Sequence, residues 1–264
     1  MNILATGDMG FIGTHLKEKL GDIKGYDLKN GFDILDKEKL DLAMSEVDVV
    51  IHLAALVSVE HSRQAPDEYV QTNIQGTMNV LEAAVNNGVK RIVYASSAAC
   101  YEPNSSVYAM TKYASENLMQ IYSPIIENVS LRFFNIYGTG QNPAYAAVIT
   151  AFMKGIEDGE VVIYGDGHQT RDFISVDDIC DAIILAAFNE VKSGSVMDIG
   201  TGEETSVNQL LKIMSKLYDK PTKIIRASER KEVRNSRADV KVAKKAIKFK
   251  ANIPLKRGLE TMIK

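Results

Sequence analysis

The 264-residue sequence contains no tryptophan and only two cysteines, Cys100 and Cys180, and these scarcities exclude several classes of protein. Two cysteines are too few for a disulfide framework, and their spacing is not that of metal ligands. We therefore predict no metal site and a reducing, cytoplasmic environment. The sequence also lacks a basic leader and any apolar run of about 18 residues, so we expect neither secretion nor a membrane span.

A strong charge of either sign is missing as well. The formal net charge is −3 and the isoelectric point is about 5.9, which gives no electrostatic reason to expect nucleic acid as a partner. Lysines crowd only the segment KVAKKAIKFK (241–250), where their spacing is typical of the solvated face of a helix. With 45% hydrophobic and 25% charged residues, the composition is that of a globular protein with a sizeable core.

Apolar strand-like segments alternate with longer segments of helical period along the chain. NILATG leads into FIGTHLKEKLG, VDVVIHLAA leads into YVQTNIQGTMNVLEAAVNNG, and VKRIVYASS follows. Several of the strand segments are nearly continuous in Val, Ile and Leu, as expected for strands covered by helices on both faces. The pattern predicts an α/β protein with a doubly wound parallel sheet, that is, a Rossmann fold. No Pro- or Ser-rich linker divides the chain, so we expect the less regular C-terminal half to form a smaller, closely packed lobe.

A glycine-rich segment follows the first expected strand and opens the first expected helix. ATGDMGFIGTHL places Gly7, Gly10 and Gly13 at intervals of three. Glycines permit a tight turn and a close backbone approach, and free N–H groups at a helix start bind pyrophosphate, so the segment predicts a dinucleotide loop. An ordinary structural turn is the alternative. The residues assigned to this loop are Gly7, Asp8, Met9, Gly10, Phe11, Ile12 and Gly13.

Asp27 ends the second expected strand, about 20 residues after the loop. A carboxylate there accepts hydrogen bonds from the adenosine ribose and repels a 2′-phosphate. Leu28 beside it offers no cation, whereas Lys29 does. The position therefore favours NAD over NADP as the cofactor.

At this point the chain resembles the extended short-chain dehydrogenase/reductases, of the NAD-dependent nucleotide-sugar epimerase/dehydratase type and similar to UDP-glucose 4-epimerases. The resemblance rests on TGDMGFIG, FDILD, HLAA, YVQTNIQGT, ASSAACY, YAMTK, LRFFNIYGTGQNP and GDGHQTRDFISVDD, in that order. It implies further cofactor contacts from Asp33, Ile34, Leu53, Ala54, Ala55, Asn73 and Ser96, and from Tyr108 and Lys112 of YAMTK.

The resemblance also implies the organisation of the chain and its substrate contacts. Residues 1–135 and 172–200 would form the NAD-binding Rossmann domain, and residues 136–171 and 201–264 the nucleotide-sugar-binding lobe. Substrate contacts would come from Ser97, Asn135, Arg171 and Arg230, the last through a segment, SERKEVRNSRAD, that matches only with a one-residue shift. Two alternatives stay open: Asn135 as a turn cap, and Arg171 as a structural brace to Asp172.

Ser97, Tyr108 and Lys112 are the expected catalytic residues. On a helix, Tyr108 and Lys112 lie four residues apart on one face. The pKa of a free tyrosine is about 10, and a nearby ammonium and the positive nicotinamide ring both favour the phenolate. We expect Lys112 to hold the nicotinamide ribose and lower the pKa of Tyr108, while Ser97 orients the sugar hydroxyl. Ser96 competes with Ser97, because neighbouring residues of a strand face opposite sides.

Two shortened segments depart from the family. Only five residues separate Asp27 from Asp33, too few for a strand–helix–strand excursion, so we predict that the second crossover helix is missing. Only six residues separate Tyr101 from Tyr108, where relatives carry a longer loop. We expect a more open substrate side.

The residues after Ser97 help to choose the reaction. The family's sugar 4,6-dehydratases carry an Asp–Glu pair there, whereas this chain has Ala98 and Ala99, which disfavours elimination and decarboxylation. The preferred prediction is an NAD-dependent UDP-glucose/UDP-galactose 4-epimerase. The alternatives are an NAD(P)H-dependent 4-keto nucleotide-sugar reductase and a catalytically idle NAD-sensing regulator. The resemblance also implies a homodimer formed by the helix containing Tyr108 and the helix spanning Asn73 to Asn87.

Overall fold

The structure is a computed structural model that describes residues 1–142, 148–230 and 232–263, and it divides into two compact units. The first comprises residues 1–133, 180–198 and 241–249, and the second comprises residues 134–179, 199–240 and 250–264. The assignment of cofactor to the first and of sugar to the second stays a prediction. Within the described ranges, every helix is too short or too polar to span a bilayer.

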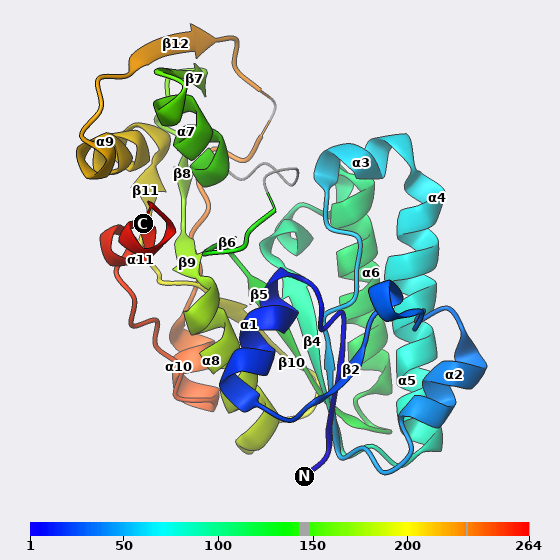
Figure 1. The fold of residues 1–264 in the computed structure, drawn as a ribbon. Helices are drawn as coiled ribbons and strands as arrows, with labels where there is room; N and C mark the ends of the chain where they lie inside the picture. The colour runs from blue at the N-terminus through cyan, green and yellow to red at the C-terminus, as the bar shows by residue number, and fades with distance from the viewer. Residues whose placement is uncertain (143–147, 231, 264) are drawn as a thin grey trace. The chain divides into compact units, whose positions relative to one another are not determined.

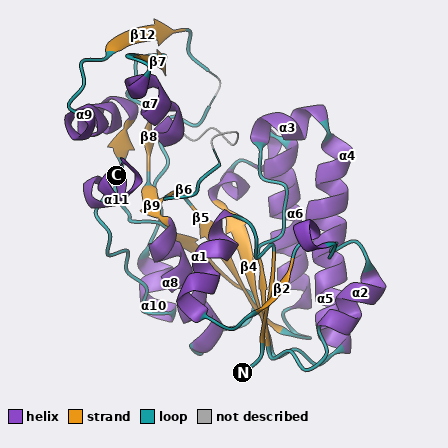
Figure 2. Ribbon diagram, in the orientation of Figure 1, coloured by secondary structure: helices purple, strands orange, loops and turns teal. Residues whose placement is uncertain are grey.

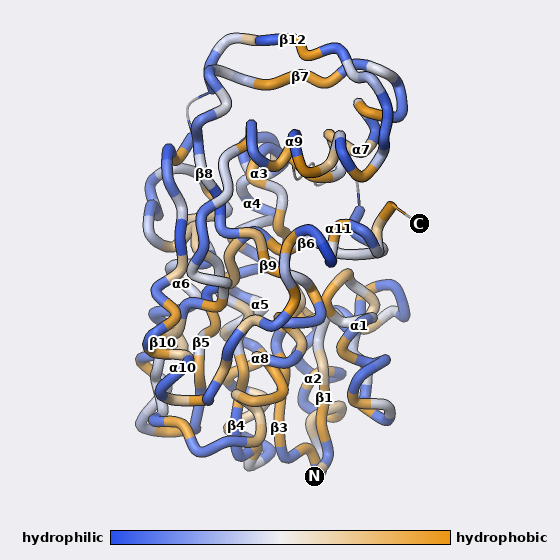
Figure 3. Tube along the Cα trace, turned by 90° about the vertical axis from the view of Figure 1, so that its left-hand side faces the viewer, coloured by the Kyte–Doolittle hydropathy of each residue, from blue (hydrophilic) through white to orange (hydrophobic). Residues whose placement is uncertain are grey.

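The first unit is built on a six-stranded sheet with the order β10-β5-β4-β3-β1-β2 (Figure 1). All the neighbouring pairs from β2 through β5 are parallel. Figure 3 shows hydrophobic colours along β3 and β4, and β1 and β3 are buried throughout, as expected for central parallel strands. The predicted α/β Rossmann fold is confirmed. The strands are β1 (Ile3–Thr6), β2 (Lys24–Tyr26), β3 (Val49–His52), β4 (Arg91–Ser97), β5 (Glu127–Phe133) and β10 (Ser195–Ile199).

Helices cover both faces of this sheet (Figure 2). α1 (Phe11–Leu20) and α8 (Val176–Phe188) lie on one face, and α5 (Gly76–Asn86) and α6 (Val107–Tyr122) lie on the other. Burial of apolar side chains between α5 and the sheet supplies the main core of this unit, at roughly 25 cal/mol for each Å² removed from water. The shorter elements are α2 (Lys37–Ala43), α3 (Val59–Gln64), α4 (Pro66–Tyr69), η2 (Val70–Gln75, a π-helix), η3 (Ala98–Tyr101), η4 (Pro103–Ser105) and α10 (Lys241–Ala246).

The connection after β2 is short, as the sequence predicts. The single 3₁₀ turn η1 (Leu28–Asn30) occupies the space between Asp27 and Asp33, and α2 then leads directly to β3. β2 consequently forms one edge of the sheet. The predicted loss of the second crossover helix is confirmed. The solvated helix predicted for KVAKKAIKFK is present over its first six residues as α10, with Ala243 buried and its lysines exposed.

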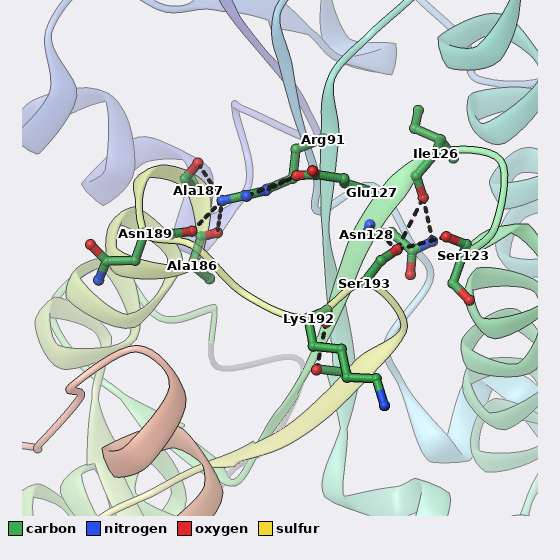
Figure 4. A network of polar contacts seen from close by, with 11 residues as sticks. Arg91, Ser123, Ile126, Glu127, Asn128, Ala186, Ala187, Asn189, Lys192 and Ser193 are labelled. Carbon is green, nitrogen blue, oxygen red and sulfur yellow. Dashed lines mark hydrogen bonds and ion pairs between the residues drawn. The ribbon is translucent and has the colours of Figure 1, made fainter.

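Arg91 ties the amino-terminal end of β4 to the end of α8 (Figure 4). Its Nη1 donates hydrogen bonds to the carbonyl oxygens of Ala186, Ala187 and Asn189. These carbonyls lie at the end of the helix, where no further turn supplies N–H donors. Its Nε and Nη2 bind the carboxylate of Glu127 on β5, at 3.2 and 2.9 Å. One guanidinium thus caps a helix and joins two strands, at the end of the sheet opposite to the strand ends that carry the candidate site.

The described part of the second unit combines three strongly amphipathic helices, α7, α9 and α11, with small sheets. Its core includes Phe152, Ile163, Leu210, Leu211 and Leu259. β7 and β12 pair in parallel, β6 pairs with β9, and β8 with β11. The elements are β6 (Asn135–Tyr137), α7 (Val148–Glu157), β7 (Glu160–Tyr164), β8 (Thr170–Arg171), β9 (Phe173–Ser175), β11 (Thr205–Ser206), α9 (Val207–Tyr218), β12 (Lys223–Ala227) and α11 (Leu255–Ile263).

Candidate active site

The glycine loop between β1 and α1 has a shape that only glycine allows at two positions. Gly7 has a φ of +72°, and a Cβ atom there would lie 2.7 Å from the backbone nitrogen of Ala54. A Cβ atom at Gly13 would lie 2.5 Å from the Cα atom of Asp8. α1 begins just after Gly10, which provides no side-chain cap, so its first N–H groups are available to an anionic ligand. The loop therefore fits the pyrophosphate of a dinucleotide.

Asp27 and Lys29 fasten the loop to the end of β2. The Asp27 carboxylate accepts hydrogen bonds from the backbone N–H groups of Met9, at 3.1 Å, and of Lys29, at 2.9 Å. The Lys29 ammonium donates to the carbonyl oxygen of Met9 at 2.8 Å. Because each carboxylate oxygen accepts more than one hydrogen bond, Asp27 keeps capacity for a ribose hydroxyl. Asp8 is buried and its carboxylate pairs with Lys17 at 2.7 Å.

The other expected cofactor residues fall into two groups. Leu53, Ala54 and Ala55 follow β3 and are half-buried, with the Ala54 backbone directly against Gly7. Asp33 accepts a hydrogen bond from the backbone N–H of Leu35, and its own carbonyl accepts one from Tyr26. Ile34 is buried in the core, where it packs on Gly76.

The side chain of Asn73 forms its hydrogen bonds with groups of the protein itself. It lies in the π-helical segment η2 and is only 1% exposed. Its oxygen accepts from the N–H of Leu56, and its amide group donates to the carbonyl of Leu56 and to the hydroxyl of Thr111. Both amide hydrogens are therefore occupied, so the residue supports the segment after β3 and does not offer these donors to a ligand.

Ser97 and Tyr108 come together at the carboxyl end of β4. Ser97 is the last residue of β4, and the N-cap Ser106 starts α6 two residues before Tyr108. The Ser97 hydroxyl lies close enough to the phenol of Tyr108 to influence its pKa. The Ser97 oxygen also accepts from the N–H of Ala99 at 3.2 Å, which fixes its position. The carboxyl ends of parallel strands are where ligands of doubly wound folds bind, so this pair lies on the expected side of the sheet.

Lys112 lies one turn after Tyr108 but its ammonium binds elsewhere. It is buried and donates a hydrogen bond to the carbonyl oxygen of Ala95 at 2.7 Å. Burial lowers the pKa of Lys112 to about 8. Burial also raises the pKa of Tyr108 to about 12, while the nearby Ser97 hydroxyl acts in the opposite direction. The expected lowering of the tyrosine pKa by Lys112 is thus absent from the protein alone, because loss of water around the phenol dominates.

Ser96 faces away from this pair, as strand alternation requires. It is buried and donates a hydrogen bond to Glu116 at 2.7 Å. Glu116 also binds the guanidinium of Arg132 through both carboxylate oxygens, at 2.9 and 2.6 Å. Of the two serines, Ser97 is therefore the one that meets Tyr108. The neighbouring thiol of Cys100 is buried, and burial raises its pKa, so it is a poor nucleophile.

A group of polar side chains that the sequence motifs do not predict supports this strand end. Arg132 lies over the ring of Tyr101, 4.6 Å from its centre, and the Tyr101 hydroxyl donates to the carboxylate of Asp198 at 2.9 Å. The available signal is Glu116, which lies four residues after Lys112 on the same face of α6, with Arg132 in an otherwise apolar strand. An acid and a base in buried segments indicate a pair.

The three expected substrate residues of the second unit have partners within that unit. Arg171 pairs with Glu232 at 2.6 Å, and its neighbour Asp172 instead accepts from the backbone N–H groups of Thr201 and Gly202. The alternative of an Arg171–Asp172 brace is therefore wrong. The guanidinium of Arg230 lies over the ring of Tyr164, 3.4 Å from its centre. Asn135 donates its backbone N–H to the carbonyl oxygen of Asp172.

Comparison with known proteins identifies the class. Residues 3–200 match the NAD dependent epimerase/dehydratase family, and the chain belongs to that family. A UDP-N-acetyl-alpha-D-glucosaminuronate decarboxylase of Bacillus cytotoxicus is 30% identical over 98% of this chain and 96% of its own. NAD is the cofactor, and the glycine cradle between β1 and α1 fits it.

Two solved structures resemble the whole chain closely. A UDP-N-acetylglucosamine 4-epimerase of Methanobrevibacter ruminantium, bound to UDP-N-acetylmuramic acid, is 30% identical with a TM-score of 0.92, over 99% of this chain and 96% of its own. A UDP-glucose 4-epimerase of Thermotoga maritima, bound to UDP-glucose, is 29% identical with a TM-score of 0.92, over 100% of this chain and 97% of its own.

Proposed function

We propose that this chain is a nucleotide-sugar 4-epimerase that interconverts UDP-glucose and UDP-galactose, or a related NDP-sugar, by transient oxidation at carbon 4. The observation that carries the proposal is the placement of Ser97 beside Tyr108 at a strand end, with Lys112 one turn later and a glycine loop at the start of the same sheet. Ala98 and Ala99 occupy the positions where the dehydratases of the family carry acids. A 4-epimerase requires no such acids, because the proton and the hydride both return to the substrate.

The proposed roles follow from the chemistry of each side chain. The glycine loop and Asp27 would hold NAD, which would supply the transient oxidation of carbon 4 and the return of the hydride to the opposite face of the sugar. Tyr108 takes the proton of the O4 hydroxyl as general base and gives it back at the end. Ser97, fixed by Ala99, orients the same hydroxyl. Lys112 binds the nicotinamide ribose once its ammonium turns from the Ala95 carbonyl.

The charge of the bound cofactor matters to Tyr108. A phenol with a pKa of about 12 is almost entirely protonated at neutral pH. A positive nicotinamide ring and a nearby ammonium both favour the phenolate. We propose that the protein alone keeps Tyr108 as a phenol and that the oxidised cofactor lowers its pKa toward the working range.

The substrate class has support from relatives and from the second unit. The two structural relatives described above carry UDP-sugars. Arg171 is only 14% exposed in its side chain, and its guanidinium has five N–H donors, so it can bind a diphosphate in addition to Glu232. We propose Arg171 and Asn135 as contacts to the nucleotide sugar. Arg230 is the third proposed contact. One face of its guanidinium stacks on Tyr164, and we propose that the other face meets the substrate.

Conversion of UDP-galactose without added reductant tests the reaction. We expect UDP-glucose to accumulate in NMR spectra, and we expect Tyr108→Phe to abolish it while NAD still binds. Tyr122→Phe is the matched control, because Tyr122 ends the same helix and its hydroxyl contacts Met78. Full activity of Tyr108→Phe would show that another group is the base.

The same assay separates the competing functions. A panel of UDP-, dTDP- and GDP-sugars identifies the substrate if UDP-galactose is not converted. Release of CO₂ from a UDP-uronate would assign a decarboxylase, the activity named for the Bacillus cytotoxicus relative. Stoichiometric NADH consumption with a 4-keto sugar would assign the reductase, which the short segment after Asp27 favours. NAD binding without any hydride transfer would assign the idle sensor.

A homodimer is the proposed assembly. The outer face of α6 exposes Met110, Tyr113 and Ile121, which are 38%, 41% and 66% accessible, and α5 exposes Val85. Apolar side chains at this helical spacing suit a helix-to-helix interface between two copies. Light scattering after gel filtration should give twice the 29.1 kDa mass, and Ile121→Asp should give the monomer.

A further inference from the structure

A buried row of hydrogen bonds connects the end of β1 with the first turn of α6. Its members are uncharged side chains that lie on five different elements, and each is at most 1% exposed. The side chains in the row are Thr6, His52, Thr77, Asn73 and Thr111. The proposed reaction gives His52 no part, although it is a titratable group in the middle of the first unit.

The donor and the acceptor of each hydrogen bond around His52 can be assigned from the hydrogen atoms that each group carries. The Thr77 hydroxyl donates to the carbonyl oxygen of Asn73 at 2.6 Å, so its oxygen must accept from Nε2 of His52, which lies 3.0 Å away. His52 therefore carries its proton on Nε2. Its bare Nδ1 then accepts the hydroxyl hydrogen of Thr6 at 2.7 Å.

The remaining bonds extend the row in both directions. The Thr6 oxygen accepts the backbone N–H of Ala54 at 3.2 Å, and Ala54 is the residue against which Gly7 packs. At the other end, Asn73 donates to the hydroxyl of Thr111 at 3.0 Å. Thr111 in turn donates to the carbonyl oxygen of Tyr108 at 2.9 Å. The row thus begins beneath the cofactor loop and ends on the backbone of the proposed base.

The surroundings keep His52 neutral. Burial lowers the pKa of His52 to about 3, and the charge of Lys112 acts in the same direction. A protonated ring would carry hydrogen on both nitrogens, and Nδ1 would then meet Thr6 donor to donor. Only the neutral Nε2–H tautomer satisfies both threonines.

We propose that His52 is a positioning residue, whose Nε2–H tautomer fixes the glycine loop relative to the turn of α6 that carries Tyr108. It acts through Thr6 and Ala54 on the cofactor side and through Thr77, Asn73 and Thr111 on the catalytic side. A small misplacement of a reacting group can slow an enzyme by up to about a hundredfold, so a device that sets this distance affects turnover. The kinetic part rests on the proposed function, whereas the tautomer and the NAD affinity do not.

The tautomer is tested by NMR of the ¹⁵N-labelled imidazoles in the NAD-bound protein. Replacing His15, His61 and His168 by Gln leaves His52 as the single histidine, so its signals need no further assignment. We expect the pattern of a proton on Nε2, unchanged from pH 8 to pH 5. In the same background, Thr77→Val should remove this single-tautomer pattern. A proton on Nδ1, or titration near pH 6.5, would overturn the proposal.

Function is tested at the two ends of the row. Thr6→Val should weaken NAD binding by calorimetry, Thr111→Val should lower kcat, and Thr77→Val should do both, each by about tenfold. Val80→Ala is the control, because Val80 is fully buried on the helix that carries Thr77 and takes part in no hydrogen bond of the row. Val80→Ala should lower the stability of the protein but leave kcat and NAD affinity within about twofold of the wild-type values.

Two results separate positioning from mere structural support. We expect the NAD affinity of the double variant Thr6→Val/Thr111→Val to depart from the product of the single effects by more than about threefold, because both ends act through His52. Strictly multiplicative effects would overturn the proposal. If no sugar is turned over at all, the proposed function fails, while the NAD affinities and the tautomer still decide the role of His52.

Discussion

The ammonium nitrogen of Lys112 lies 2.7 Å from the carbonyl oxygen of Ala95, to which it donates a hydrogen bond. It also lies 4.9 Å from the centre of the Tyr94 ring. These two contacts compensate for the water that the buried ammonium of Lys112 has lost. Because the ammonium binds Ala95, the pKa of Tyr108 is set mainly by burial, which raises it, and by Ser97, which acts in the opposite direction.

The ionisation of Tyr108 should therefore depend on the cofactor. Without NAD we expect a pKa of about 12, and with NAD⁺ a lower value, because the positive ring stabilises the phenolate. The measurement is the phenolate absorbance near 295 nm across pH, taken as the difference between the wild type and Tyr108→Phe. An unchanged titration on adding NAD⁺ would contradict the expectation.

His52 should make the protein less stable in mild acid. Its pKa is about 3 in the folded chain and near 6.5 when unfolded, so the unfolded state takes up a proton first as the pH falls. The contribution is fully present above pH 6.5 and is lost at about 1.4 kcal/mol per pH unit from there toward pH 3. Urea unfolding between pH 7 and pH 5 measures the slope. The control is His52→Asn, which should flatten it, and a wild-type slope of zero would contradict the argument.

Gly258 should not tolerate alanine, although alanine favours helices by about 1 kcal/mol. A Cβ atom at Gly258 of α11 would lie 2.2 Å from the hydroxyl oxygen of Tyr137. Overpacking of this kind destabilises by about 1–3 kcal/mol. Thermal unfolding measures the loss, and adding Tyr137→Phe should restore part of it.

Tyr137→Phe alone should be neutral or stabilising. The Tyr137 hydroxyl is buried and has no hydrogen-bond partner among the described residues. Removing a buried polar group without a partner relieves a desolvation penalty of about 1–3 kcal/mol. A clear loss of stability in chemical unfolding would indicate that the hydroxyl has a role in the folded state.

Arg91→Met should destabilise the first unit by about 1–3 kcal/mol, because the buried carbonyls at the end of α8 lose their donor. Figure 4 shows that these carbonyls and Glu127 converge on one guanidinium. Lys90→Met is the matched control, because Lys90 is 71% exposed and its pair with Asp48 is worth at most about 1 kcal/mol. Equal losses for the two variants, measured by urea unfolding, would show that Arg91 is not a clamp.

Much of the first unit is predictable because local pattern and global fold agree there. The glycines at 7, 10 and 13 sit where a parallel strand passes into a helix, and this spacing depends only on the backbone. The shortened segment after Asp27 could also be predicted, because a strand and a helix need a minimum length of chain.

What the sequence could not supply is the direction of side chains and their local dielectric. Arg171 and Asp172 are neighbours, yet one binds a carboxylate and the other binds backbone N–H groups. In the protein without NAD, burial raises the pKa of Tyr108, and the extent of burial depends on the packing of elements distant in the sequence. Asn73 is predicted to contact the cofactor, but its amide group donates to Leu56 and Thr111.

The short connection after β2 has a consequence for behaviour at high concentration. β2 is an edge strand of the six-stranded sheet, and exposed edges offer unpaired N–H and C=O groups to other chains. This edge is only three residues long, and it begins at an exposed lysine. Both properties discourage strand addition and aggregation. The chain lacks an outer strand and helix, and the edge strand that results is too short to pair with a strand of another chain.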